Sequence, residues 1–443
     1  MMKDKSRLLG EEKMSKTLLI MGAPTMIGML VSALYNFVDA YYVGKLGTLP
    51  MAAVSVVNPL SYIGMFVGLL FGCGGNSVIA RAFGRGSKED VKKYSASALY
   101  IALFVISVLI ILTIIFLNPV LHILGSLPQY DDLAREYAII FTLGLFFNVY
   151  NMCMNNMIVA EGNSSISMLA MLIGAVVNII LDPVFIFTFG MGVFGAGLAT
   201  MISRIVSTII YTCYVMSKNS MLSINLCSVS LKKKTILDIV SVGIPVALFQ
   251  LINGGAQTVL NNLARKYGVD AQAAIGIVNK IMFLELNLLY GFFKGCSPVV
   301  GYNYGAGNMK RVREATRLAL IWSIGATFIC GTILVLFRSD IMYIFNQESE
   351  QVVRIGAFAL VVYALSYLTY GYQIIIGNFF IAIGEVKRGG LLSLGKGIIY
   401  MIYLVVMERL LGLQGLILAQ ACTDITGTII TKLVHNDYNR KQC

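Results

Sequence analysis

The sequence has little charge and almost no histidine. Only 13% of its 443 residues are charged, whereas 57% are hydrophobic, and a soluble domain usually has about 25% charged residues. A soluble protein of this length needs a polar surface that this chain cannot supply. Its long apolar runs give the reason, because about 20 apolar residues span a bilayer as a helix.

The eight cysteines and two histidines form no recognisable site. The cysteines are scattered, mostly within apolar runs and without a Cys-x-x-Cys pair, and the histidines are His122 and His435. This pattern supports neither a disulfide framework nor a zinc site. We expect no cofactor and no metal beyond a transported Na⁺. A Walker A motif is also absent, so the chain does not encode nucleotide-driven pumping.

Twelve apolar segments are long enough to cross a membrane, so the expected fold class is an all-α polytopic membrane protein. They lie roughly at 17–44, 51–80, 94–117, 136–160, 166–188, 194–216, 235–264, 273–300, 315–337, 352–382, 390–411 and 415–434. An even number of spans places both termini on one side, and the basic residues of the tail and of alternate loops gather there. Basic loops stay in the cytoplasm. We therefore predict a cell-membrane protein with cytoplasmic termini, and the net charge of +12 does not indicate nucleic-acid binding.

The two halves of the chain resemble each other. Residues 22–99 align with 243–320 at a constant offset of 221 without a gap, and the pairs include Pro24 with Pro245. Such a repeat predicts two homologous six-helix bundles related by an axis along the membrane normal. The predicted parts are a cytoplasmic tail (1–16), a first lobe (17–217), a cytoplasmic linker (218–234), a second lobe (235–434) and a second tail (435–443).

Paired bundles of this kind are typical of secondary transporters that work by alternating access. We expect the chain to function as a monomer. Pro24 and Pro245 hold equivalent places early in the first helix of each half. Each favours a kink because it removes a backbone hydrogen bond. The paired kinks are interpreted either as hinges or as packing features.

Acids inside membrane spans are costly and therefore indicate function. Asp39 shares a helical face of the first span with Tyr35 and Asn36, and Asp182 shares one of the fifth span with Asn178. If the two acids face each other in an apolar wall, they could hold a proton near neutral pH or bind a cation between them. The alternative is a structural hydrogen-bond cluster that joins helices.

The second half lacks acids at the equivalent positions, where Leu260 and Leu404 stand instead. Its polar residues form a neutral, aromatic lining that suits flat, lipophilic substrates, because Tyr offers both a ring face and a hydroxyl. Core packing is the alternative for each residue. The predicted substrate cavity comprises Tyr35, Asn36, Asn148, Asn151 and Asn155 in the first half, and Gln250, Asn253, Gln257, Tyr363, Tyr367 and Tyr370 in the second.

Three further charges fall within spans of the second half. Glu285 and Lys294 are nine residues apart and point in opposite directions on an ideal helix, so Lys396 is the predicted partner of Glu285. This second-lobe charge site would serve substrate binding or coupling, or would be a structural ion pair. Arg204, near the inner end of the sixth span, is expected to snorkel toward the interface.

Several motifs together resemble the multidrug and toxic compound extrusion (MATE) family. They are APTMIGMLVSALYNFVDAYYVGKLG, AAVSVVNP and NSVIARAFGRGSKEDVKK in the first half, and GIPVALFQLINGGAQTVLNNLARKYG and GYNYGAGNMKRVREA in the second. The resemblance implies two six-helix bundles that exchange H⁺ or Na⁺ for drugs, dyes and other organic cations. It also implies a coupling site in the first lobe made of Asp39, Asn178, Asp182, Thr200 and Tyr137.

The predicted function is therefore a secondary multidrug exporter of lipophilic organic cations. A first alternative is a flippase for a lipid-linked saccharide in the wider superfamily, but such proteins often have more helices and a strongly basic cavity. A second alternative is an intramembrane enzyme or receptor. Apart from the two aspartates, the sequence offers no nucleophile and base or metal set, so we expect no enzyme.

Overall fold

The structure is a computed structural model that describes residues 2–345 and 349–442, and within these residues it contains helices and no strand. The helices are α1 (Met2–Gly10), α2 (Met14–Gly44), α3 (Thr48–Val57), α4 (Leu60–Gly84), α5 (Lys88–Ile115), α6 (Leu117–Leu124), α7 (Asp131–Ala160), α8 (Ser164–Pro183), α9 (Gly192–Met216), α10 (Lys233–Arg265), α11 (Val269–Gly305), α12 (Met309–Leu336), α13 (Arg338–Phe345), α14 (Glu350–Ile383) and α15 (Val386–Gln442).

Eleven helical segments of the described chain are long and apolar enough to cross a membrane. The last of them, α15, contains two predicted spans, because Gly412 has φ 60° and ψ −135° and interrupts the helix there. Only glycine adopts such a backbone conformation readily. With α15 counted as two spans, the prediction of twelve membrane-spanning helices is confirmed.

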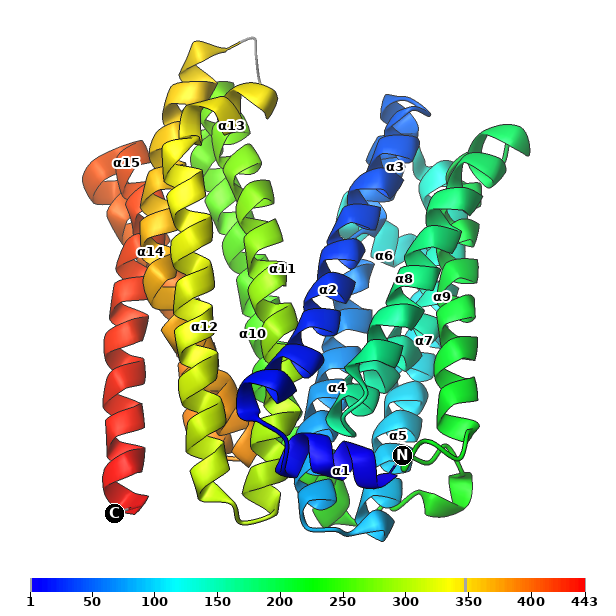
Figure 1. Ribbon diagram of the computed structural model, residues 1–443. Coiled ribbons are helices and arrows are strands. Elements are labelled where there is room, and N and C mark those ends of the chain that lie inside the picture. Colours follow the sequence, from blue (N-terminus) through cyan, green and yellow to red (C-terminus); the bar gives the residue numbers. More distant parts are fainter. Residues whose placement is uncertain (1, 346–348, 443) are drawn as a thin grey trace.

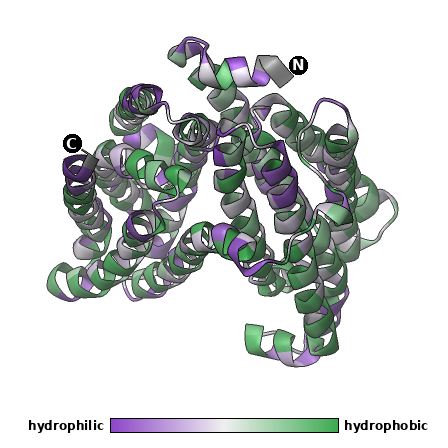
Figure 2. Ribbon diagram, turned by 90° about the horizontal axis from the view of Figure 1, so that it is seen from below, coloured by the Kyte–Doolittle hydropathy of each residue, from purple (hydrophilic) through white to green (hydrophobic). Residues whose placement is uncertain are grey.

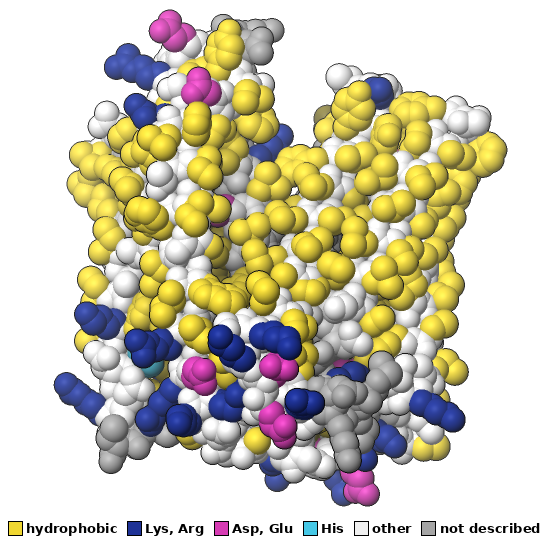
Figure 3. Space-filling view, viewed as in Figure 1, with side chains coloured by type: hydrophobic (Ala, Val, Ile, Leu, Met, Phe, Trp, Pro, Cys, Tyr) yellow, Lys and Arg dark blue, Asp and Glu magenta, His cyan; other side chains and the backbone are white. Residues whose placement is uncertain are grey.

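The helices form two bundles that diverge toward one end (Figure 1). The first bundle comprises α2–α9 and the second comprises α10–α15. They contact each other through α2 with α11 and through α4 with α10 and α11. We call the end that holds both termini the closed end and the opposite end the open end; the space-filling view shows a notch between the bundles at the open end (Figure 3).

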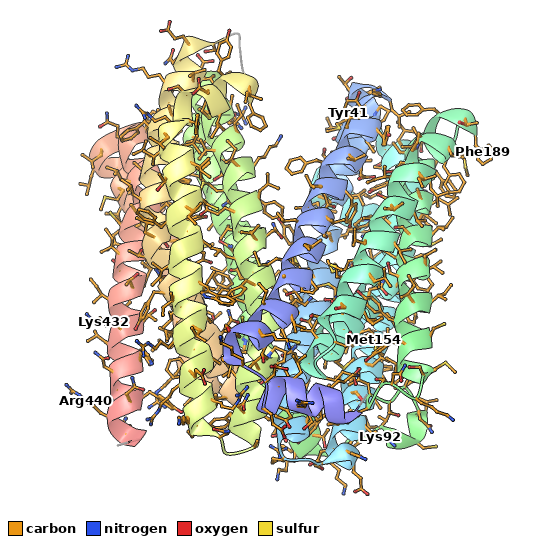
Figure 4. The ribbon with its side chains drawn as sticks, in the orientation of Figure 1. Tyr41, Lys92, Met154, Phe189, Lys432 and Arg440 are labelled. Carbon is orange, nitrogen blue, oxygen red and sulfur yellow. The ribbon has the colours of Figure 1, made fainter. Side chains whose placement is uncertain are left out.

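The two ends also differ in side-chain chemistry. Lys and Arg side chains gather toward the closed end, whereas hydrophobic side chains cover the middle of the molecule (Figure 3). Tyr41 and Phe189 lie at the open end, and Lys92 and Arg440 lie near the closed end (Figure 4). Hydrophobic residues also predominate along the helices seen from below (Figure 2). This distribution fits helices surrounded by lipid with one basic flank.

Glycines of the sequence repeat allow the two bundles to approach closely. A Cβ atom built on Gly84 would lie 2.0 Å from the carbonyl oxygen of Tyr302, and one on Gly305 would lie 2.2 Å from that of Arg81. Gly305 and Tyr302 follow Gly84 and Arg81 by the same 221 residues that relate the two halves. The contact between α4 and α11 is therefore reciprocal, as a pseudo-two-fold axis between the bundles requires.

The N-terminal segment, predicted as a tail, forms α1 and bridges the two bundles at the edge of the closed end (Figures 1 and 2). In the first bundle, Lys5 Nζ lies 3.2 Å from Glu161 Oε1 and donates to the Tyr214 hydroxyl at 2.6 Å. The hydroxyl groups of Ser6 and Tyr302, a residue of the second bundle, lie 2.6 Å apart. Helix α1 is thus bonded to both halves of the molecule.

The segment between α9 and α10 is fixed to the first bundle. The backbone N–H groups of Ser223 and Ser230 donate to the hydroxyls of Ser95 and Ser97 on α5, both at 2.9 Å. These bonds hold the connection in place even though it contains only the short 3₁₀ turn Leu226–Ser228.

Both repeat prolines lie inside helices that contact the opposite bundle. Pro24 is in α2, which packs on α11, and Pro245 is in α10, which packs on α4. The hinge role predicted for them stays a prediction.

Candidate functional site

The two aspartates of the first half lie next to each other. Asp39 comes from α2 and Asp182 from α8, and their carboxyl groups are close enough to interact directly. Asn178 Nδ2 donates to Asp182 Oδ1 at 3.2 Å and lies 3.5 Å from Thr200 Oγ1 on α9. Three helices therefore contribute to one polar cluster in an apolar bundle.

The backbone at Asp182 departs from a regular helix. Helix α8 ends at Pro183, and the π-helical turn Val184–Thr188 follows directly. Such turns are rare and frequently occur at functional sites. The distortion lies next to the fully buried Asp182 side chain.

Two oxygen atoms of the cluster lack partners. Asn178 Oδ1 and Asp182 Oδ2 are buried and make no hydrogen bond in the described part of the chain. Buried polar atoms are nearly always satisfied, and carboxylate and amide oxygens suit a proton or a hard cation. Among the described residues no group of three or more His, Cys, Asp or Glu could hold a metal, so any bound cation would also need the neutral oxygens.

Aromatic side chains border the pair. Tyr137 on α7 is buried and stacks on Phe141, with ring centroids 5.5 Å apart. Both Tyr137 and Tyr35 lie within electrostatic range of Asp39. The hydroxyls of these two residues can therefore respond to the charge of the carboxylate.

The prediction that Arg204 snorkels is wrong. Its guanidinium carbon lies 5.6 Å from the centroid of the Phe141 ring, and its buried Nη1 has no hydrogen-bond partner among the described residues. It lies within electrostatic range of Asp39. The neighbouring acid and the ring face draw the guanidinium into the bundle.

The asparagine face of α7 packs on α9. Asn151 Nδ2 donates to the carbonyl oxygen of Arg204 at 2.8 Å, and Asn155 Nδ2 donates to the Tyr211 hydroxyl at 2.7 Å. Lys294 reaches across from the second bundle and donates to Asn155 Oδ1. Asn151 and Asn155, predicted to line a cavity, are therefore engaged in bonds within the protein.

The predicted pair of Glu285 with Lys396 is wrong. Lys396 Nζ lies 2.6 Å from Asp424 Oδ1, whereas both carboxyl oxygens of Glu285 are buried without a hydrogen-bond partner in the described chain. Asp424 was missed although it falls within the predicted span 415–434. Counting every acid in the predicted spans would have found it.

One of the three tyrosines predicted on α14 lies against the Lys396 ammonium. Tyr363, Tyr367 and Tyr370 are all buried, and Lys396 Nζ lies 3.2 Å from the Tyr370 ring centroid. The remaining residues predicted for the cavity differ in exposure. Tyr35, Asn148, Gln250 and Asn253 are half-buried, and Asn36 and Gln257 are exposed.

The MatE family model matches residues 24–184 and 245–407. The chain belongs to the MatE family. The match covers Asp39, Asn178, Asp182 and Lys396, and it confirms the resemblance inferred from the helix and loop motifs. Arg204 and Asp424 lie outside the matched ranges.

Full-length MatE relatives and structures agree with this assignment. The chain is 28% identical over 426 residues to the multidrug export protein MepA of Staphylococcus aureus, which covers 95% of this chain and 94% of the relative. A crystal structure of MATE in complex with MaL6 has a TM-score of 0.91 at 26% identity, with 96% of each chain covered. An outward-facing multidrug resistance MATE family transporter has a TM-score of 0.90 at 26% identity and the same coverage.

Proposed function

We propose that the chain is a secondary multidrug exporter that exchanges H⁺ or Na⁺ for lipophilic organic cations by alternating access. The observation that carries the proposal is the proximity of Asp39 and Asp182 inside one bundle of a molecule whose two bundles pack closely at one end. The near-complete match to a relative named for multidrug export supports the substrate class.

Ion binding would act through the mutual repulsion of the two carboxylates. A proton or Na⁺ between Asp39 and Asp182 removes that repulsion and satisfies oxygens that now lack partners. Because the acids come from α2 and α8, the bound ion favours one relative position of these helices. Helix α2 also packs on α11 of the second bundle, so the ion can shift the balance between two arrangements of the bundles.

The closed end is proposed to face the cytoplasm. Basic side chains gather there (Figure 3), and cytoplasmic flanks of membrane proteins are rich in Lys and Arg. Both termini and the segment 218–234 would then be cytoplasmic, with lobes at 17–217 and 235–434. We propose a monomer in the cell membrane that is not an enzyme and does not bind nucleic acid.

Transport by reconstituted protein tests the proposal. Purified chain in liposomes should move a cationic dye such as ethidium when a pH gradient or a Na⁺ gradient is imposed, and only one of the two ions should be sufficient. Collapsing the effective gradient with an ionophore should stop movement. Dye movement that ignores both gradients, or movement of a lipid-linked saccharide in place of the dye, would contradict the proposal.

A further inference from the structure

We propose that Asp424 and Tyr370 form an organic-cation site in the second bundle, that the Lys396 ammonium fills this site when no substrate is bound, and that a transported cation displaces it. The inference rests on the proposed function and extends it, because it names a binding site and an internal competitor for the substrate.

The surroundings of the Lys396 ammonium are those of a bound organic cation. Its Nζ lies 2.6 Å from Asp424 Oδ1 and 3.2 Å from the centroid of the Tyr370 ring. A carboxylate on one side and an aromatic face on the other are the groups that recognise ammonium ligands. Lysine itself therefore shows what the site can hold.

The aromatic wall extends beyond one ring. The Tyr367 ring lies 5.4 Å from the Tyr370 ring, with a 32° angle between their planes. The hydroxyl groups of Tyr290, on α11, and Tyr370 lie 3.1 Å apart. Helices α11 and α14 thus contribute three tyrosines that can contact a larger and flatter cation than an ammonium group.

The carboxylate of Asp424 is held independently of Lys396. Asp424 is fully buried, and its Oδ2 accepts a hydrogen bond from Gln420 Nε2 at 2.9 Å. Gln373 Nε2 donates to the Asp424 carbonyl oxygen at 2.7 Å, which fixes the backbone there. The acid would therefore keep its orientation when one cation replaces another at Oδ1.

The chemistry of the Lys396 side chain favours its displacement over that of an arginine. The lysine side chain is a flexible four-carbon stem and is 14% exposed. It is flanked by Gly395 and Gly397. A Cβ atom built on Gly395 would meet no other atom within 4 Å, whereas one built on Gly397 would lie 2.5 Å from Ile252 Cγ2. A buried arginine would be harder to displace, because its guanidinium group binds a carboxylate through two hydrogen bonds.

The repeat gives the charge pair a counterpart in the first bundle. The region 192–204 aligns without a gap with 412–424 at an offset of 220, and both regions begin at a glycine with positive φ, Gly192 at 55° and Gly412 at 60°. Arg204 therefore stands where Asp424 stands in the second bundle. Each bundle contains a basic side chain near an acid, but the equivalent position is basic in the first bundle (Arg204) and acidic in the second (Asp424).

This difference in charge suggests that the two bundles have different roles in transport. In the first bundle the cation is a permanently charged arginine near two acids that lie close together. In the second bundle one acid and one mobile lysine form a simple pair in contact with tyrosine. An external organic cation can take the place of the second-bundle lysine without disturbing the acid pair of the first bundle.

Equilibrium binding of tetraphenylphosphonium to the purified full-length chain tests the proposal. Lys396→Met should bind this cation about tenfold more tightly than the wild type, because an internal competitor lowers the apparent affinity by the fraction of sites that it fills. Asp424→Asn should bind it at least about tenfold more weakly, since one charge-assisted contact is lost. The double variant Lys396→Met/Asp424→Asn contains no buried charge at the site and should bind more weakly than Lys396→Met.

The controls separate this site from a structural ion pair. A purely structural pair predicts that Lys396→Met weakens binding or leaves it unchanged, which would overturn the inference. Lys266→Met removes a lysine paired with Glu408 at 3.2 Å in the same bundle and should leave the affinity unchanged. Binding of the neutral triphenylphosphine oxide should not respond to Lys396→Met.

Two further outcomes have to be distinguished: a Lys396→Met variant that does not fold for unrelated reasons, and a failure of the proposed transport function itself. If Lys396→Met does not fold, Lys396→Gln, which can still donate to Asp424, should show a smaller gain in cation affinity, and no gain would overturn the inference. If the wild type neither binds tetraphenylphosphonium nor transports any organic cation, the proposed function itself fails. If the wild type, Lys396→Met and Asp424→Asn all bind tetraphenylphosphonium with the same affinity, only the proposed second-bundle site is ruled out.

Discussion

Asp39 is the residue on which the coupling proposal depends most directly. Asp39→Asn should reduce gradient-driven dye export to background, because an amide cannot accept and release a proton or supply the charge that Na⁺ needs. The amide has nearly the same shape, so the protein should still fold and insert. Dye efflux from cells that express equal amounts of each protein measures the effect.

The control for this variant is an acid outside the cluster. Asp132 lies in the first turn of α7 and is exposed, so Asp132→Asn should export normally. Normal export by Asp39→Asn at wild-type expression would remove the first-bundle acid from the mechanism.

For individual side chains, sequence periodicity predicted part of the candidate site and missed the rest. It placed Asp39 on a polar face of α2 and Asn178 one turn before Asp182, because a helix fixes which residues share a face. It assigned the wrong partner to Lys396 and the wrong direction to Arg204. Periodicity does not fix how one helix is rotated against another, and long side chains can reach several neighbours.

Among the helices, apolar length alone predicted the twelve spans. The segment α1 had no such signal, because it is short and polar. Its position depends on partners far along the chain: Asn303 Nδ2, for example, donates to the carbonyl oxygen of Leu9 at 2.9 Å. Contacts between residues so distant in sequence cannot be inferred from local pattern.

Packing between α4 and α11 should decide how firmly the closed end seals. Gly84→Ala and Gly305→Ala each place a methyl group about where a backbone carbonyl of the other helix now lies, so each should force the bundles apart at that end. The open end should then narrow. Leu49 on α3 and Ile344 on α13 are exposed, and both helices lie toward the open end (Figure 1). Spin labels at these two positions should show a population at shorter distance by pulsed electron resonance in a background without the native cysteines.

Gly276→Ala is the matched control on α11, because no atom lies within 4 Å of the added Cβ. It should leave the distance distribution unchanged. Identical distributions for Gly84→Ala and the wild type would show that these glycines do not control closure.

The bond between α1 and the first bundle should contribute strongly to stability. Glu161 is fully buried, and its Oε2 also accepts from the Met221 backbone N–H at 2.9 Å. Glu161→Ala leaves Lys5 buried without its counter-charge, and breaking a buried pair typically costs about 3–5 kcal/mol. The melting temperature in detergent should fall clearly.

A solvent-exposed ion pair just after α1 serves as the comparison. Lys16 and Glu12 lie 3.2 Å apart at the surface, and such pairs are worth about 0–1 kcal/mol. Lys16→Ala should therefore shift the melting temperature little. Equal shifts for the two variants would mean that the buried pair does not anchor α1.

In the whole molecule, ion coupling should depend on the first bundle and substrate selectivity on the second. Asp182→Asn should abolish ion-driven transport, whereas Tyr367→Leu or Tyr370→Leu should change which dyes are carried while ion-driven transport of others continues. The reason is that the neighbouring acids Asp39 and Asp182 belong to the first bundle, while the tyrosines of α14 do not titrate near neutral pH. Transport assays with a panel of dyes under one gradient distinguish these effects.

Glu285 is the critical comparison for this asymmetry. It is a buried acid in the second bundle without a hydrogen-bond partner in the described chain. Glu285→Gln should retain ion-driven transport. If Glu285→Gln is inactive and Asp182→Asn transports normally, the coupling site lies in the second bundle.

The bridging helix α1 also imposes an order on biosynthesis. Ser6 is among the first residues to leave the ribosome, but its partner Tyr302 follows 296 residues later. At roughly 5–20 residues per second, the ribosome needs roughly 15–60 s to make that length of chain. Docking of α1 on both bundles therefore has to wait until most of the chain has been translated, and a nascent chain that ends within the first bundle leaves the hydroxyl of Ser6 without this partner.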